Sequence, residues 1–207
     1  MDYIKDPKEI ERISFEIISK NIGHKIFKEK ELSILKRVIH TTADFEYENI
    51  LKISDYAVEA GLKALKEGCT IITDTKMVEA GINKKALLST GAKVKTYISD
   101  KETIDLAKNE GITRSMASMI LASEDKSVKI FAIGNAPTAL FKLCELIKSG
   151  KAKPELIIGV PVGFVGAKES KEEVKKLNIP YIITEGRKGG SNIAAAIVNA
   201  LLYLLQR

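Results

Sequence analysis

His40 is the side chain best suited to transfer a proton at neutral pH, because imidazole alone has an ordinary pKa near neutrality. It ends an apolar helical pattern and is followed by the polar residues Thr41 and Thr42. A purely structural histidine also fits this position, since the helix dipole stabilises an imidazolium at a helix carboxyl end. The sequence therefore offers His40 as a candidate general acid and leaves the structural explanation open. The other histidine, His24, lies in a polar stretch and is expected to be exposed and without a role.

Two glycine-rich segments could bind anions through their backbone N–H groups. Gly163, Phe164, Val165 and Gly166 follow one apolar stretch, and Arg187, Lys188, Gly189, Gly190 and Ser191 follow another. Glycines ahead of a helix expose N–H groups to a ligand, and neighbouring cations strengthen the attraction. The spacing matches neither the dinucleotide-binding fingerprint nor a Walker loop. The first segment favours a backbone site for a carboxylate-bearing ligand, with a tight strand-to-helix turn without a ligand as the alternative. For the second segment, a surface loop capped by Ser191 is an equal alternative.

Other polar residues stand at the ends of predicted elements. Asp74 follows an apolar strand, and Asn135 follows another, where it could cap the next helix. Arg114 stands at a helix start, where the dipole disfavours a cation; this favours an anionic partner, although an ordinary surface arginine is an equal alternative. No metal site is predicted, because two histidines do not make a typical zinc site. No Ser–His–acid or Cys–His set can be assembled with any specificity.

Strands and helices that alternate along the chain must position these residues. Apolar stretches at 69–73, 94–98, 128–133, 156–160 and 181–184 predict strands, and helical patterns lie between them at 75–80, 100–121, 136–149, 167–177 and 190–206. This alternation predicts a three-layer α/β/α, Rossmann-like fold with a mostly parallel five-stranded sheet. Residues 1–68 are expected to add N-terminal helices to the α/β part at 69–207, within one domain. Ligands of such sheets bind beyond the carboxyl ends of the strands, where the glycine-rich segments fall.

Composition narrows the classes of protein further. The chain has 207 residues and a net charge of +6, with lysines scattered beside glutamates rather than gathered in a block. Nucleic acid is a poor partner, because there is no basic block and only 6% of the residues are aromatic. No apolar run is long enough to span a membrane. Cys69 and Cys144 lie among apolar neighbours and are expected to be reduced core residues, which suits a cytoplasmic protein.

Six stretches of the chain, taken together, resemble the precorrin-8X methylmutases, also called precorrin isomerases. They are residues 37–44, 74–82, 113–115, 134–140, 161–171 and 186–191, and they occur in the family's order over nearly the whole chain. No single stretch is decisive, but six matches in order are specific. Lys168 departs from the family pattern, in which a second alanine is usual at this position.

The resemblance implies an isomerase of cobalamin biosynthesis. The reaction would move a methyl group from C-11 to C-12 of precorrin-8X or cobalt-precorrin-8 and give hydrogenobyrinic or cobyrinic acid. The family's catalytic histidine falls on His40, no cofactor is implied, and cobalt enters only within the substrate. A homodimer with the site near its interface is also implied.

The chemistry of a tetrapyrrole polycarboxylate assigns expected roles to the remaining candidates. Arg114, Lys188 and Arg187 would clamp carboxylates, and the backbone amides of residues 163–166 and 189–191 would receive further acid arms. We call the edge formed by the loops that follow the strands the rim. Asn135, Asp74 and Thr41 would contact the substrate at the rim or would orient other groups, and Ser14 is a weaker candidate on the first helix. Two other functions stay open: a corrinoid carrier without turnover, and a nucleotide or sugar-phosphate transferase on the same fold.

Overall fold

The computed structural model describes residues 3–23 and 27–206, so the expectation for His24 lies outside the described residues. The helices are α1 (Pro7–Asn21), α2 (Glu29–Thr42), α3 (Tyr47–Ile50), α4 (Ala57–Lys66), α5 (Lys76–Gly81), α6 (Lys84–Leu88), α7 (Lys101–Glu110), α8 (Arg114–Glu124), α9 (Pro137–Lys148), α10 (Ala167–Lys175) and α11 (Ser191–Leu204). The strands are β1 (Leu51–Ile53), β2 (Thr70–Thr73), β3 (Lys93–Lys95), β4 (Val128–Ile133), β5 (Leu156–Gly159) and β6 (Tyr181–Thr184).

The described strands form one sheet in the order β1-β6-β5-β4-β2-β3. Five of them run parallel, as the alternating pattern predicts, and β1 pairs antiparallel with β6. The expectation of five strands and of an all-helical segment at 1–68 therefore missed β1. This strand has only three residues, and its partner β6 lies far along the chain, so no local pattern marks it.

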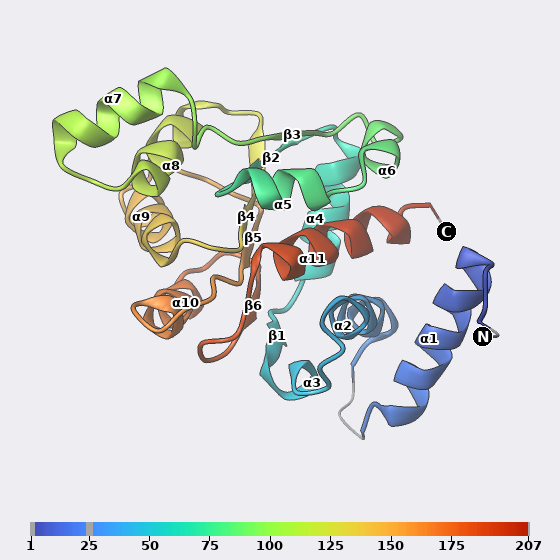
Figure 1. Ribbon diagram of the computed structural model, residues 1–207. Helices are drawn as coiled ribbons and strands as arrows, with labels where there is room; N and C mark the ends of the chain where they lie inside the picture. The colour runs from blue at the N-terminus through green and yellow to red at the C-terminus, as the bar shows by residue number, and fades with distance from the viewer. Residues whose placement is uncertain (1–2, 24–26, 207) are drawn as a thin grey trace.

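Helices cover both faces of the sheet, which confirms the three-layer arrangement (Figure 1). Helices α4, α5, α6 and α11 pack into one apolar core, and α8, α9 and α10 pack into the other. Helix α2 lies against α11 on the first side, and α1 lies outside α2 (Figure 1). The alternating sequence pattern therefore encodes the sheet and its two covers, whereas α1 and α2 form an additional layer.

Local chemistry sets the ends of several helices. Asp6 caps α1 by accepting a hydrogen bond from the N–H of Lys8 at 3.0 Å, and Pro7 occupies the first turn, where its missing N–H costs no hydrogen bond. The expected helix at 100–121 is instead two helices, α7 and α8. The chain breaks at Gly111, which adopts the left-handed conformation with φ 61°, and Thr113 then caps α8. This break places Arg114 at the first residue of α8, where the sequence predicted a helix start.

The sheet has a topological switch point between β2 and β4. Strand β3 is added on one side of β2, and β4, β5 and β6 are added on the other side, so β2 and β4 are neighbours although β3 lies between them in the sequence. Loops after two such strands leave the sheet toward opposite faces, and this opening is where ligands of parallel α/β folds bind. Asp74 follows β2 and Gly134 follows β4 at this point. The fold thus brings two of the sequence-predicted polar segments together at the carboxyl end of the sheet.

Candidate active site

His40 lies on the last turn of α2 with its imidazole exposed and held by two residues of α1. The Nδ1 atom is 2.8 Å from the Ser14 hydroxyl oxygen. The Phe15 ring stacks on the imidazole with a centroid separation of 5.2 Å and an interplanar angle of 20°. Because Nδ1 is engaged by Ser14, Nε2 is the ring nitrogen left to act on a ligand. Ser14 therefore contacts the histidine, which assigns it an orienting role within this site.

Phe15 also contacts Arg37, which lies one turn before His40 on α2. The Arg37 guanidinium lies 4.7 Å from the Phe15 centroid and 4.9 Å from the Tyr203 centroid, and it pairs with Glu11 at 2.7 Å. Cations attract the faces of aromatic rings at such distances. A continuous stack thus connects α11 to the imidazole of His40 through α1 and α2. Arg37 lies in the first stretch that resembles the family, but no role was predicted for it from the sequence.

An apolar groove of about 340 Å³ opens beside His40. Ile10, Ile17 and Phe45 line it, and their side chains are 47%, 53% and 39% exposed. Ile18 is the one buried residue of α1, so most of the apolar side chains of this helix are left uncovered. The histidine therefore stands at the edge of an uncovered apolar surface, which suits contact with a large, partly apolar ligand or with another protein chain.

Asp74 is fully buried and accepts three backbone hydrogen bonds from the segment that follows β4. Its two carboxylate oxygens accept from the N–H groups of Gly134 at 2.9 Å, Asn135 at 2.8 Å and Ala136 at 2.7 Å. Burial raises the pKa of Asp74, and the three N–H donors act in the opposite direction. The N–H groups ahead of α9, which could otherwise bind an anion, are therefore bound by the carboxylate of Asp74. It orients this loop rather than contacting a ligand on the rim.

Asn135 was expected to cap α9, and this expectation is wrong. The cap residue is Ala136, without a side-chain hydrogen bond to the helix, because Pro137 is the first helical residue and the residue before a proline is kept in an extended conformation, here with φ −97° and ψ 107°. The Asn135 side chain is exposed on the rim instead, where it is free to meet a ligand. Its position there keeps it a candidate rim contact.

The two glycine-rich loops are joined to each other by backbone hydrogen bonds. The N–H of Gly163 donates to the carbonyl of Arg187 at 3.1 Å, and the N–H of Gly190 donates to the carbonyl of Val160 at 2.9 Å. A Cβ atom on Gly189 would lie 2.1 Å from the Val160 carbonyl oxygen, so this close approach requires glycine. The expectation that Gly163 and Gly190 present their own amides to a ligand is wrong, because both donors hold the loops together.

Lys171 lies buried beneath these loops, on α10. Its ammonium donates to the carbonyls of Pro161 at 3.1 Å and Lys188 at 2.9 Å, and to the Thr184 hydroxyl at 3.3 Å. Burial lowers the pKa of Lys171 to about 8, and the carboxylate of Glu172 acts in the opposite direction. No role was predicted for Lys171 from the sequence. A signal existed, since Lys171 falls on the same helical face as Ala167 and Val174, both buried.

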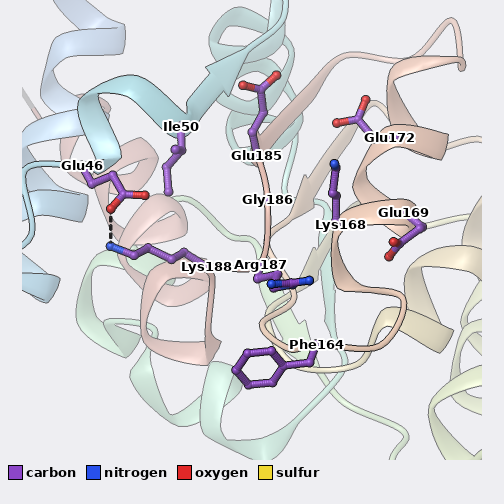
Figure 2. Close-up of a pocket in the computed structure, with 10 residues that line it drawn as sticks. All are labelled: Glu46, Ile50, Phe164, Lys168, Glu169, Glu172, Glu185, Gly186, Arg187 and Lys188. Atoms are coloured by element: carbon purple, nitrogen blue, oxygen red, sulfur yellow. Dashed lines mark hydrogen bonds and ion pairs between the residues drawn. The ribbon is translucent and has the colours of Figure 1, made fainter.

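Lys188, expected to clamp a ligand carboxylate, is already paired with two acids of the chain. Its ammonium donates to Asp44 at 2.5 Å and to Glu46 at 2.7 Å, and the second contact is drawn in Figure 2. These hydrogen bonds raise the pKa of Lys188, and the bond from Lys188 is the main cause of the lowered pKa of Asp44. A paired lysine is a weaker receptor for a ligand anion than a free one. Lys188 instead ties its loop to the segment that directly follows His40.

Arg187 is the more available cation of this loop. It is exposed, and its guanidinium lies 5.8 Å from the Phe164 centroid (Figure 2). Both residues border an open pocket of about 710 Å³, which is also lined by Glu46, Ile50, Lys168, Glu169, Glu172, Glu185, Gly186 and Lys188. Phe164 and Val165 are 87% and 89% exposed, which leaves two apolar side chains at the tip of the loop.

The remaining candidates lie along the same rim or beside it. Arg114 is exposed, and the preceding Thr113 hydroxyl lies 3.1 Å from the Thr138 hydroxyl, which places Arg114 beside the start of α9. Ser191 is buried and contacts the Thr75 hydroxyl at 3.1 Å, so it joins two loops. Gly166 packs near α9, and Thr41 is exposed next to His40. Side chains far apart in sequence therefore share one edge of the molecule.

Comparison with known proteins agrees with this arrangement. The sequence model of the precorrin-8X methylmutase family matches residues 9–204. The chain belongs to the precorrin-8X methylmutase family. It is 48% identical to the cobalt-precorrin-8 methylmutase of Salmonella typhimurium over 100% of this chain and 99% of that protein. It is 46% identical to the protein of the same name from Priestia megaterium, over 96% of this chain and 88% of the relative.

A solved structure of a precorrin-8X methylmutase carries the same fold. The protein from Thermus thermophilus superposes with a TM-score of 0.89 at 39% identity, covering 95% of each chain. Methylmutases are isomerases, and this family serves cobalamin biosynthesis. No helix within the described part of this precorrin-8X methylmutase homologue is long and apolar enough to cross a membrane.

Proposed function

We propose that this chain isomerises precorrin-8X or cobalt-precorrin-8 by moving a methyl group from C-11 to C-12 of the macrocycle. The observation that carries the proposal is the exposed imidazole of His40, fixed by Ser14 and Phe15 at the edge of an apolar groove. Family membership supports the reaction class. His40 is proposed as the proton donor, acting through Nε2.

A methyl shift around a conjugated ring conserves every atom and electron of the substrate. It needs a ring that is electron-poor where the methyl arrives and held in one shape. Protonation of the macrocycle by His40 meets the first need, and the proton returns to the imidazole after the shift. A positioned general acid contributes about 10²–10⁴-fold to the rate. The rest must come from positioning and from the electrostatic field of the site.

The acid arms of the substrate are proposed to bind along the rim described above. Arg187 and Arg114 are the proposed carboxylate clamps, since both guanidinium groups are exposed there. The exposed side chains of Thr41 and Asn135 are proposed rim contacts. No cofactor is proposed for the reaction, and cobalt would belong to the substrate.

A second copy of the chain is proposed to cover the groove beside His40. The exposed side chains of Ile10, Ile17 and Phe45 support this, because isolated chains rarely leave such a contiguous apolar surface open. The site would then lie near the dimer interface, and a partner would enclose more of a large ligand. Sedimentation of the native chain tests the proposal, with Ile17→Glu as the variant expected to yield a monomer and Ile104→Glu, on the distant α7, as the control.

The buried, unpaired thiols of Cys69 and Cys144 support a reducing, cytoplasmic setting as part of this proposal. The decisive experiment for the reaction is incubation of the purified chain with metal-free and with cobalt-loaded substrate. A change in the visible spectrum without a change in product mass is expected for at least one of them. Pigment that binds but keeps its spectrum would instead support a carrier.

A further inference from the structure

The ammonium of Lys171 is the one strongly buried cation of the described chain, and no carboxylate contacts it there. Burying a charge costs several kcal/mol unless hydrogen bonds compensate. Its acceptors come from two segments of the chain. One is the Pro161 carbonyl in the loop after β5, and the others are the Thr184 hydroxyl at the end of β6 and the Lys188 carbonyl in the loop that follows. The lysine therefore fixes the orientation of two peptide groups at once.

Those two peptide groups are the ones between residues 161 and 162 and between residues 188 and 189. None of the described peptide bonds is cis. In a trans peptide the N–H points opposite to the carbonyl of the same unit. Since the carbonyls of Pro161 and Lys188 point inward to Lys171, the N–H groups of Val162 and Gly189 point away from it.

The N–H groups of Val162 and Gly189 find no acceptor within the described residues, whereas their neighbours Gly163 and Gly190 donate to the opposite loop. The two units also lie close together. A Cβ atom built on Gly189 would be 2.7 Å from the Pro161 carbonyl oxygen. Any side chain at position 189 would separate the loops, so glycine keeps the two peptides adjacent. Two neighbouring free N–H groups beside a buried positive charge form a receptor for a carboxylate.

We infer that Val162 and Gly189 donate their backbone N–H groups to one acid arm of the substrate, and that Lys171 is the positioning residue that turns both groups outward. The inference rests on the proposed function for the identity of the ligand. It names a new contact at Val162, and it assigns the buried lysine a role in binding rather than in the methyl shift. Thr184 assists, since its hydroxyl also donates to the Lys188 carbonyl at 2.8 Å.

The test follows backbone amide resonances by NMR while hydrogenobyrinic acid, the proposed metal-free product, is added. In the native chain the signals of Val162 and Gly189 are expected to shift. Lys171→Met keeps an unbranched side chain, one atom shorter than lysine, but removes its charge and donors. In this variant both shifts are expected to vanish, and the Kd is expected to rise about tenfold or more, which corresponds to the loss of one charged hydrogen bond. Lys176→Met removes an exposed lysine from the end of the same helix and serves as the control.

Turnover adds a second readout. With Lys171→Met, KM is expected to rise while kcat stays within about threefold, because only binding is altered. If this variant does not fold, Thr184→Val takes its place, with an expected rise in KM of about threefold. Native amide signals that do not respond to the pigment, or a variant with native KM and lowered kcat, would overturn the inference. A native chain whose signals shift without turnover would refute the proposed reaction but leave this contact standing.

Discussion

Replacing Ser14 with alanine removes a hydrogen bond that fixes the His40 ring, and the cost of this change follows from the geometry. The Ser14 hydroxyl lies 2.8 Å from Nδ1, a full-strength hydrogen-bond distance. When His40 is charged, Nδ1–H must donate to the hydroxyl oxygen, and after the proton leaves Nε2 that same bond holds the correct tautomer. A hydrogen bond to a charged group contributes about 1.5–3 kcal/mol. At about 1.4 kcal/mol for each factor of ten, Ser14→Ala should lower kcat about 10–100-fold.

The assay is steady-state turnover of the corrinoid substrate at neutral pH, recorded by visible absorbance. KM should stay within about threefold, because the hydroxyl is engaged by the imidazole rather than by substrate. Ser19→Ala is the matched control. That hydroxyl lies on the same helix and donates to the Phe15 carbonyl at 2.6 Å, without contact to His40. A kcat for Ser14→Ala equal to that of Ser19→Ala would refute the orienting role.

Other predictions concern stability and reactivity. Asp74→Asn should lower the free energy of unfolding in urea by about 1–3 kcal/mol, because the new amide leaves at least one buried N–H group without an acceptor. Native stability in this variant would contradict the role of Asp74. Cys69 and Cys144 should resist thiol reagents at pH 8 until the chain unfolds, since burial raises their pKa values to about 12 and about 11. Rapid labelling of these two thiols in the native chain would count against this prediction. Asp44→Asn should be less stable than the native chain at pH 7. The lowered pKa of Asp44 means that its pairing with Lys188 stabilises the fold above the ordinary carboxyl pKa and is lost as the pH falls, so the two urea midpoints should converge in acid; a constant difference would exclude this ion pair as the cause.

The sheet could be predicted because its strands are short apolar runs separated by helical patterns. A strand that is buried on both faces appears in the sequence as a continuous apolar run, as in the fully buried β2 and β5. Strand β1 has no such pattern, because it has only three residues, of which Leu51 is buried and Lys52 and Ile53 are partly buried, and its pairing depends on β6, far along the chain. The break at Gly111 was missed for a related reason, since one glycine in an otherwise helical pattern does not fix where a helix ends.

The placement of the glycine-rich loops at one edge of the sheet could also be predicted, whereas the pairing of their side chains could not. The rule for parallel sheets placed the loops at one edge. That Lys188 would be neutralised by Asp44, 144 residues earlier, depends on how α2 docks on α11, which no local pattern encodes. Lys171 resembles a solvated lysine in a charged helix, and only its helical spacing from Val174 indicates burial.

The central claim is that the imidazole of His40 donates the proton that permits the methyl shift, and one comparison tests it most directly. Native chain and His40→Ala are given the same substrate, and binding and isomerisation are measured separately for each. We predict that His40→Ala binds the pigment with an affinity close to that of the native chain and shows no turnover above about one part in a hundred. Turnover at the native rate in the absence of this imidazole would contradict the account.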